Sequence, residues 1–424
     1  MALDRRDFLV RTGLLLSAAG IDGALFEDDA TAAPETIAAP GWNTVRAQFR
    51  LDRGWIHLAA FLLASHPRTV RASIERFRRR LDARPVQTLQ QEWPRYEAAV
   101  LRAAANYLRA DPADIALTDS TSMGLALLYN GIDLRPGQDV LATRHDFFVT
   151  RDTLRTRAAR VGASYREISL YEEQGGQISE QAIVQRLRAA VKPQTRVVAL
   201  TWVHSSTGVK LPIRRIADAL AELNSGRGEH DRVLLCVDGV HGFGVENVTM
   251  PQLGCDFFVA GCHKWLFGPR GTGLVWAKRE AWPFATPTIP SFTDVGTPGS
   301  AGTPGGYHSF EHRWALSAGF EFQRWVGKAR VAARTHALSS RMKAGLRTMS
   351  HVKLYTPTAE RLSAGIVCFD VRGLTPPEVV NRLRAKRIIV TATPYSPSYA
   401  RLSPSIVNTP GEIDKALSAI RSLR

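Results

Sequence analysis

The segment between residues 233 and 277 decides the fold that the sequence predicts. It reads VLLCVDGVH over 233–241, CDFFVAGCHK over 255–264 and GLVWA over 273–277. Each stretch contains an apolar run of strand length. Asp238 directly follows the first run, and a buried acid is costly unless a cation or several hydrogen-bond donors meet it. We therefore expect buried strands whose polar ends contribute to a binding site.

The same pattern extends toward the N-terminus. Apolar runs of strand length occur at 138–143, 163–170 and 196–203. Helical periodicity lies between several of the runs, as in the segment 213–220 that follows Pro212. Such alternation predicts an α/β fold in which helices cover a mostly parallel sheet. Ligands of such sheets bind at the carboxyl ends of the strands, so polar residues there are candidates for a site.

The sequence beyond residue 288 predicts a second, smaller domain. The stretch 289–306 is rich in Gly, Pro, Ser and Thr, which is typical of a surface loop. Helical segments at 310–326 and 329–348 follow, and then a strand, a helix, two strands and a helix. The expected organisation is an N-terminal arm over 33–60, a large domain over 61–299 and a small α+β domain over 300–424.

The first 32 residues resemble a twin-arginine export signal. Arg5 and Arg6 precede a short apolar stretch at 13–20, and Ala30-Thr31-Ala32 offers a small-residue cleavage site. The apolar stretch is too short to span a hydrocarbon core of roughly 30 Å, so no stable membrane anchor is expected. The resemblance implies export to the periplasm by the twin-arginine translocase. An ordinary amphipathic N-terminal helix is the alternative.

The composition excludes some classes of protein. With 45% hydrophobic and 22% charged residues among 424, the chain is neither disordered nor collagen-like. The formal net charge of +16 is compatible with anionic ligands, an acidic surface or solubility alone. The cysteines lack the spacing of metal ligands, and we expect buried thiols at Cys236, Cys255, Cys262 and Cys368. We expect neither a metal ion nor a nucleic acid partner.

Three sets of polar residues stand where strands are expected to end. Residues 117–124 form a hydroxyl-rich turn before an apolar helix, which can bind phosphate, although Ser and Thr are also ordinary helix caps. Asp238 could keep a heteroaromatic ring nitrogen protonated, or it could cap the turn that follows it. Lys264 has aromatic and apolar neighbours that suit an amine nucleophile, whereas an isolated lysine would extend to water.

Together these sets resemble the class V aminotransferase branch of fold type I pyridoxal-phosphate (PLP) enzymes. That branch also includes cysteine desulfurases and isopenicillin N epimerase-like proteins. The resemblance covers roughly residues 45–424, and its most specific part is Asp-Gly-x-His at 238–241 followed by His-Lys-Trp at 263–265. Within the branch, Cys-His-Lys-Trp at 262–265 and the twin-arginine leader are most similar to the periplasmic enzymes that tailor the siderophore pyoverdine.

The resemblance implies a role for three residues around the reactive part of the cofactor. Lys264 would hold PLP as a Schiff base and move protons at the alpha carbon of the substrate. Asp238 would pair with the pyridinium nitrogen, so that the ring withdraws electrons from a developing carbanion. His241 would lie near the phenolic oxygen of the cofactor, unless it is a packing residue.

The resemblance also implies the remaining contacts. Thr121, Ser122 and His263 are the expected phosphate contacts. Phe147 stands where relatives place a ring that stacks on the pyridine. Arg401, in Arg-Leu-Ser at 401–403, would bind the carboxylate of the substrate bidentately. Phe147 and Arg401 could alternatively be packing or surface residues.

The chain departs from the family pattern at several positions. Many relatives have His where this chain has Trp202 and Asn where it has Ser205, so the contacts of the phenolic oxygen are expected to differ. Relatives often carry Gly-Thr in place of Arg313 and Trp314, the Thr reaching the phosphate of a neighbouring subunit; Arg313 could substitute electrostatically. Residues 386–410 contain no cysteine, which argues against persulfide chemistry.

The expected function is that of an exported, aminotransferase-like PLP enzyme. It would act at the alpha carbon of an amino acid moiety in a secreted small molecule or peptide, such as the glutamyl group of a siderophore precursor, and the resemblance implies a homodimer. An epimerase or lyase of the isopenicillin N epimerase type is the alternative. Two further alternatives are a protein of this fold that only binds a ligand and a basic protein that binds acidic surfaces.

Overall fold

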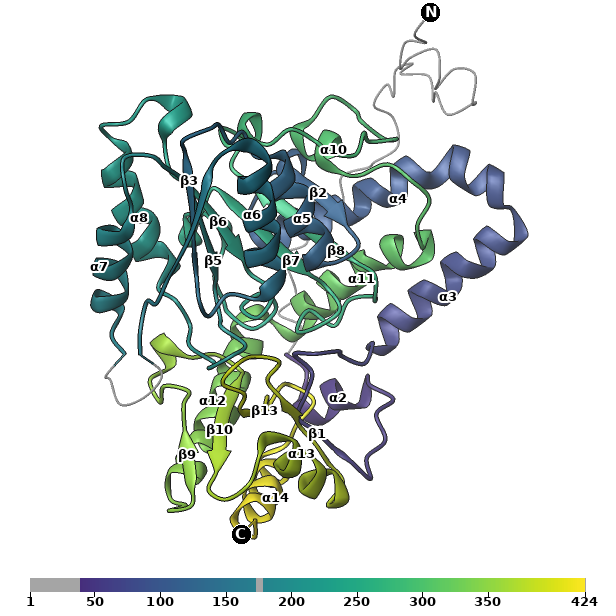
Figure 1. The fold of residues 1–424 in the computed structure, drawn as a ribbon. Helices are drawn as coiled ribbons and strands as arrows, with labels where there is room; N and C mark the ends of the chain where they lie inside the picture. Colours follow the sequence, from purple (N-terminus) through teal and green to yellow (C-terminus); the bar gives the residue numbers. More distant parts are fainter. Residues whose placement is uncertain (1–38, 173–177, 424) are drawn as a thin grey trace, which may run out of the picture.

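The computed structural model describes residues 39–172 and 178–423 (Figure 1). The predicted export signal at 1–32 and the first residues of the predicted arm lie outside the described residues. The described chain forms a large upper part around one sheet and a smaller lower part that holds the C-terminus. The predicted two-domain α/β organisation can therefore be compared with the structure element by element.

A seven-stranded sheet forms the centre of the large domain. Its strands lie in the order β2-β8-β7-β6-β5-β3-β4, and only β8 runs antiparallel to its neighbours. The strands are β2 (Ile115–Thr118), β3 (Asp139–Thr143), β4 (Ser164–Ile168), β5 (Thr195–Thr201), β6 (Leu234–Asp238), β7 (Phe257–Gly261) and β8 (Gly273–Ala277). The mostly parallel sheet confirms the predicted fold class. Strand β2 was not predicted, because it is only four residues long and its second half was interpreted as part of the hydroxyl-rich turn at 117–124.

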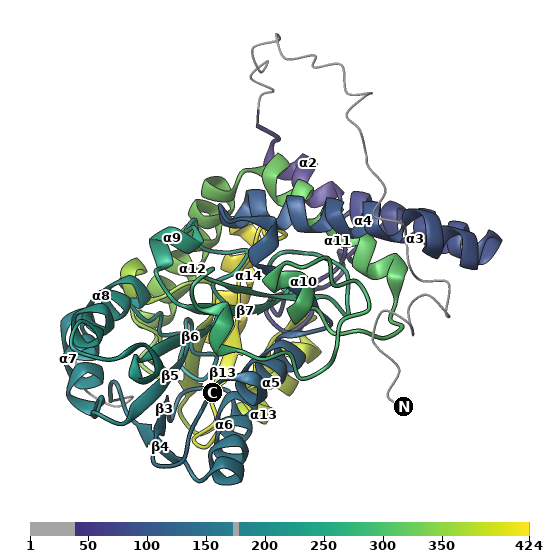
Figure 2. The ribbon, with the colours of Figure 1, turned by 90° about the horizontal axis from the view of Figure 1, so that it is seen from above.

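Helices cover both faces of this sheet (Figure 2). They are α5 (Thr121–Gly131), α6 (Phe148–Val161), α7 (Glu180–Ala190), α8 (Ile213–Asn224), α9 (Met250–Leu253) and α10 (Pro298–Gly302), with 3-10 turns at Pro112–Asp114, Glu229–Asp231 and Trp282–Phe284. Successive residues of β6 alternate between two cores: Leu235 and Val237 face one, Leu234 and Cys236 the other. The sheet is thus buried on both sides, as a parallel sheet requires.

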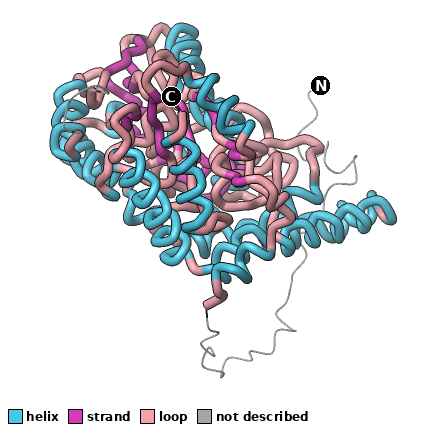
Figure 3. The backbone as a smooth tube through the Cα atoms, turned by 90° about the horizontal axis from the view of Figure 1, so that it is seen from below, coloured by secondary structure: helices cyan, strands magenta, loops and turns pink. Residues whose placement is uncertain are grey.

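A long helical hairpin projects from the large domain (Figure 3). It consists of α3 (Arg68–Ala83) and α4 (Pro85–Leu108), and α11 (Phe310–Val326) packs against both. The basic cluster at 76–84 lies on the exposed part of α3, where Glu75 forms ion pairs with Arg78 and Arg79. Among the described residues, no helix combines the length and hydrophobicity that crossing a lipid bilayer would demand.

The small domain is built around a four-stranded antiparallel sheet with the order β12-β13-β10-β9. Its elements are α12 (Lys328–Arg347), β9 (Val352–Leu354), the 3-10 turn Glu360–Leu362, β10 (Val367–Val371), α13 (Pro376–Ala385), β11 (Ile388–Ile389), β12 (Thr391–Ala392), β13 (Ala400–Leu402) and α14 (Pro410–Arg421). The N-terminal arm contributes α2 (Trp42–Ala47) and β1 (Ile56–His57), and β1 pairs in parallel with β11. Helix α11, although it falls within the stretch predicted for the small domain, packs on α3 and α4 of the large domain.

A buried carboxylate joins the two domains. Glu246, which follows β6, accepts hydrogen bonds from Lys210 Nζ at 2.8 Å and from His336 Nε2 at 2.9 Å. Lys210 belongs to the large domain and His336 to α12. These partners hold the pKa of Glu246 below its ordinary value although burial alone would raise it. The ionised carboxylate is therefore the form that holds this junction together.

Replacing this carboxylate is expected to weaken the junction. Glu246→Gln removes the buried carboxylate that accepts from the half-buried Lys210 and His336, and we expect a loss of about 3 kcal/mol in the free energy of unfolding. The measurement is urea denaturation at pH 7. Glu222→Gln removes the exposed carboxylate that pairs with Arg188 and should cost less than about 1 kcal/mol. Equal losses in the two variants would contradict a structural role for the junction.

Candidate active site

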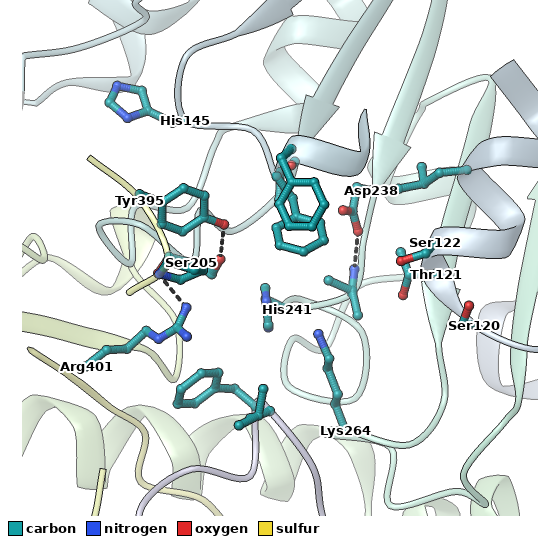
Figure 4. Close-up of a pocket in the computed structure, with 18 of the residues that line it drawn as sticks. Ser120, Thr121, Ser122, His145, Ser205, Asp238, His241, Lys264, Tyr395 and Arg401 are labelled. Atoms are coloured by element: carbon teal, nitrogen blue, oxygen red, sulfur yellow. Dashed lines mark hydrogen bonds between the residues drawn. The ribbon is translucent and has the colours of Figure 1, made fainter. Parts of the chain in front are cut away.

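A cavity of about 370 Å³ opens at the carboxyl edge of the sheet, between the two domains (Figure 4). It is lined by all eight residues that the sequence predicted: Thr121, Ser122, Phe147, Asp238, His241, His263, Lys264 and Arg401. The large domain contributes seven of them from the ends of its strands, and Arg401 comes from β13 of the small domain. The fold thus brings all eight predicted site residues together around one cavity.

Asp238 is the last residue of β6 and is only 1% exposed. Its Oδ1 accepts a hydrogen bond from the backbone N–H of Val240 at 3.1 Å, so it does cap the following turn while it also faces the cavity. Burial raises the pKa of Asp238 to about 6. A carboxylate in this position gains most from a cationic partner inside the cavity.

Lys264 follows β7, in the turn that leads toward β8. Burial lowers the pKa of Lys264 to about 8; Asp238 opposes this shift and Arg401 adds to it. The turn is fixed on both sides of Lys264, because the carbonyl of His263 accepts from Ala64 N and the carbonyl of Trp265 accepts from Gln323 Nε2. Lys264 therefore presents an amine that loses its proton more easily than an exposed lysine would.

The N-terminus of α5 forms a candidate anion-binding site at one end of the cavity. Ser120 is the helix cap, since its Oγ accepts from Met123 N at 3.1 Å. The hydroxyl of Thr121 is not used for capping and instead accepts from Gly261 N at 2.7 Å, which ties the helix to the end of β7. His263 Nδ1 is buried without a hydrogen-bond partner among the described residues. Thr121, Ser122 and His263 thus surround a helix terminus that favours negative charge.

Arg401 provides the main cation on the small-domain side. Its Nη1 donates to the carbonyl of Ser205 at 2.9 Å, its Nε donates to Thr391 Oγ1 at 3.2 Å, and its guanidinium lies 4.3 Å from the ring centroid of Phe61. It forms no ion pair with a carboxylate in the described parts of the chain. A buried guanidinium without an anion is suited to bind the carboxylate of a ligand.

His241 and Phe147 form part of the wall. Burial lowers the pKa of His241 far below its ordinary value, so its imidazole is neutral, and its Nδ1 has no hydrogen-bond partner among the described residues. Phe147 precedes α6 and lies 4.3 Å from Phe148, ring centroid to centroid. Trp202 does not line the cavity: it is a core residue packed against Gly242, where a Cβ atom would overlap the indole ring.

Among the other lining residues, His145 and Tyr395 were given no role from the sequence, and Ser205 was noted only as a departure from the family pattern. His145 stacks on Tyr171 with ring centroids 4.2 Å apart. It lies two residues after the end of β3, and this position near a strand end could have identified it. Tyr395 lies in the loop between β12 and β13, and no local pattern marks it, because only the packing of the small domain brings that loop to the cavity.

Arg313 is engaged inside its own chain. It is 4% exposed, donates to Asp119 Oδ1 at 3.2 Å and lies 3.8 Å from Glu97 Oε1. Its neighbour Trp314 is buried in an aromatic cluster on α3 and α4. The role of Arg313 at the phosphate site of another subunit stays a prediction, and within its own chain the guanidinium is engaged by Asp119 and Glu97.

Comparisons with known proteins identify similar chains. The family model described as aminotransferase class V matches residues 64–414. Isopenicillin N epimerase of Streptomyces clavuligerus is 25% identical over 91% of this chain and 99% of its own, and a probable cysteine desulfurase of Xylella fastidiosa (strain Temecula1) is 25% identical over 93% and 98%. A solved structure of a C-DES mutant with glycine covalently linked to its PLP cofactor superposes with a TM-score of 0.81 at 20% identity, covering 89% of this chain and 99% of that one.

Asp238→Asn is expected to stabilise the protein without its cofactor. Asp238 ionises near pH 3.8 in the unfolded chain and near pH 6 when buried. The ionised carboxylate therefore lowers the free energy of unfolding by about 3 kcal/mol above pH 6. This loss of stability disappears as the pH falls toward 4.

The measurement is urea denaturation of the cofactor-free proteins between pH 4 and pH 8. The variant should exceed the wild type in stability at pH 7.5, and the two curves should converge at pH 4. A stability difference that does not change with pH would contradict the assignment of a costly buried charge to Asp238.

Proposed function

The chain belongs to the aminotransferase class V family of PLP-dependent enzymes, and we propose that it is an exported member that acts at the alpha carbon of an amino acid moiety. The observation that carries this proposal is the placement of Asp238, Lys264 and Arg401 around one cavity. These residues provide a partner for a ring nitrogen, an amine and a cation for a carboxylate. An amino acid bound to PLP needs each of them.

The residues of the cavity fit pyridoxal 5'-phosphate. Asp238 is buried with one backbone donor and no cationic side chain within ion-pair distance among the described residues, so a pyridinium nitrogen would complete its environment. The phosphate would lie at the N-terminus of α5, against Thr121, Ser122 and His263. Lys264 would carry the cofactor covalently. His241, as a neutral imidazole with a free ring nitrogen, would suit the phenolic oxygen.

Each residue then has a defined task in the reaction. When bound, the cofactor supplies an electron-withdrawing ring that weakens the bonds at the alpha carbon. Asp238 would keep the proton on the ring nitrogen. Lys264 would accept and return a proton at the alpha carbon, because its pKa of about 8 is close to neutral pH. Arg401 orients the substrate through its carboxylate.

The cysteines argue against desulfurase activity, although cysteine desulfurases are among the relatives. All four cysteines are buried with no exposed surface, and none lines the cavity. Cys368 lies opposite Arg401 in the pairing of β10 with β13, but it is fully buried and is not among the lining residues, and burial of the other three raises their thiol pKa values. A persulfide carrier needs an accessible, reactive thiolate, which this cavity does not provide.

Epimerisation is the second candidate, because isopenicillin N epimerase matches almost the whole chain. The two reactions differ in what they consume: aminotransfer needs a 2-oxo acid as acceptor, whereas epimerisation exchanges the alpha hydrogen with solvent and needs no second substrate. Incubation with L-glutamate in D₂O, with and without a 2-oxo acid, separates them.

Two features support a secreted peptide, such as a siderophore precursor with a glutamyl group, as the substrate. The leader at 1–32 resembles a twin-arginine signal, and this export route carries proteins that fold and load a cofactor before they leave the cytoplasm. The cavity contains a single carboxylate, Asp238, among several cationic or neutral nitrogen groups, which suits an acidic substrate. Leu62 and Phe148 are exposed at the mouth of the cavity, and this apolar rim supports the proposal of a homodimer that covers it.

Lys264→Ala is expected to abolish the absorbance band of the lysine-bound cofactor. It is also expected to lower activity by on the order of 1,000-fold or more, which is the loss typical of removing a residue that acts covalently. Borohydride reduction of the wild type followed by peptide mass spectrometry should find the cofactor on Lys264. Lys278→Ala removes a lysine that pairs with Asp256 outside the cavity and should leave the band unchanged. A reduced adduct at another lysine would refute the assignment.

Replacing Arg5 and Arg6 together by lysine is expected to retain the protein in the cytoplasm of a bacterium with an active twin-arginine pathway. The measurement is fractionation followed by immunodetection, with cofactor content checked in each fraction. Arg46→Lys, outside the leader, is the control. Periplasmic accumulation of the doubly substituted protein would contradict the proposed route.

A further inference from the structure

Two hydroxyl groups from different domains meet in the wall of the cavity (Figure 4). Tyr395 Oη and Ser205 Oγ are 2.6 Å apart. Tyr395 belongs to the loop between β12 and β13 of the small domain, and Ser205 to the loop that follows β5 in the large domain. Both residues line the cavity, so their hydrogen bond closes it between the domains.

The Tyr395–Ser205 pair carries one hydroxyl hydrogen that does not take part in the hydrogen bond between them. Two hydroxyl groups carry two hydrogens, and their mutual bond uses one of them. Neither hydroxyl forms another hydrogen bond within the described residues. The hydrogen that is left over belongs to a polar group in a largely enclosed wall, where a donor without an acceptor is unfavourable. The remaining hydrogen is therefore available to an acceptor in the cavity, either a water molecule or an oxygen of a ligand that replaces the water.

Arg401 binds the same residue from the other side. Its Nη1 donates to the backbone carbonyl of Ser205 at 2.9 Å, so Ser205 contacts the small domain through both its side chain and its backbone. Figure 4 shows Ser205 between Tyr395 and Arg401, with Asp238 on the opposite side of the cavity. The spare hydroxyl hydrogen and the spare guanidinium donors thus lie together, away from the only lining carboxylate.

Chemistry indicates which hydroxyl keeps the spare hydrogen. A phenol is more acidic than an aliphatic alcohol and is the stronger donor to an anion. Ser205 would then donate to Tyr395 Oη, and Tyr395 would donate into the cavity. The neighbouring Arg401 attracts anions to the same place.

We propose that Tyr395 is a specificity-determining residue: its hydroxyl donates to the substrate carboxylate that Arg401 also binds. Ser205 holds the Tyr395 hydroxyl in position. The inference rests on the proposed function and names its substrate class: amino acid moieties with a free carboxylate beside the reacting carbon. A substrate in which that carboxylate is an amide would lose the charge that both donors recognise.

The test measures carboxylate binding to the PLP-loaded enzyme. The probe is glutarate, which has no amine to react and whose binding is followed by the change in absorbance of the lysine-bound cofactor. Tyr395→Phe should raise the Kd of glutarate about tenfold, the loss of one hydrogen bond to a charged group. Ser205→Ala should raise it only about two- to threefold, and the double variant should match Tyr395→Phe, because Ser205 acts through Tyr395.

Two controls separate this role from a structural one. Tyr355→Phe deletes a hydroxyl that bonds Asp370 in the same domain at 2.8 Å, and it should leave the Kd unchanged. The uncharged diamide glutaramide should bind Tyr395→Phe and the wild type equally weakly. If Tyr395→Phe does not fold, Tyr395→Met lacks the hydroxyl, fills a similar volume and should give the same tenfold change.

The outcomes distinguish this inference from the proposed function. A wild-type Kd in Tyr395→Phe, or an equal change in Tyr355→Phe, would overturn the inference while the cofactor adduct on Lys264 remained. A wild-type enzyme whose cofactor band responds to neither glutarate nor L-glutamate would also overturn it, since a carboxylate site must respond to a carboxylate. Absence of the Lys264 adduct would refute the proposed function itself.

Discussion

The buried charges of Asp238 and Lys264 are the constraint on which the rest of this structure depends. Burial raises the pKa of Asp238 to about 6 and lowers that of Lys264 to about 8, so both groups lie in an environment that disfavours their ionised forms. A fold that tolerates this cost must be stable elsewhere, and two apolar cores on the faces of the sheet provide that stability. On the proposed function, a cofactor would offset this cost by bringing a cationic ring nitrogen to Asp238 and a reactive carbonyl to Lys264.

The parallel sheet explains why these two residues meet although 26 positions separate them. Strands β6 and β7 are parallel neighbours, Asp238 pairs with Val259 in the register, and Gly239 N donates to the carbonyl of Val259. Both strands therefore end at the same edge. Gly239 cannot carry a side chain, because a Cβ atom there would overlap the ring of Phe258. Antiparallel β8 lies between β7 and β2, and the end of β2 leads into α5, whose N-terminus is the candidate anion-binding site.

The small domain adds to the cavity a buried guanidinium, that of Arg401. Arg401 and Tyr395 reach the cavity from β13 and the loop before it, and both bind Ser205 of the large domain. Glu246, Lys210 and His336 hold the domains together farther from the cavity. On the proposed function, substrate recognition and domain contact share residues, and a change in the position of the small domain would change the geometry of the proposed carboxylate site directly.

The sequence by itself determined the α/β class, the helix at 310–326 and the residues at the strand ends, because the periods of buried strands and helices and the positions where strands end are local properties. The resemblance to a PLP family singled out eight residues, and all of them line one cavity. Only the tertiary structure placed α11 on the helical hairpin, neutralised Arg313 with carboxylates distant in sequence, and brought Tyr395 beside Ser205. These outcomes depend on contacts between segments up to about 200 residues apart, and such contacts are decided by the packing of whole domains, which leaves no periodic trace in the sequence.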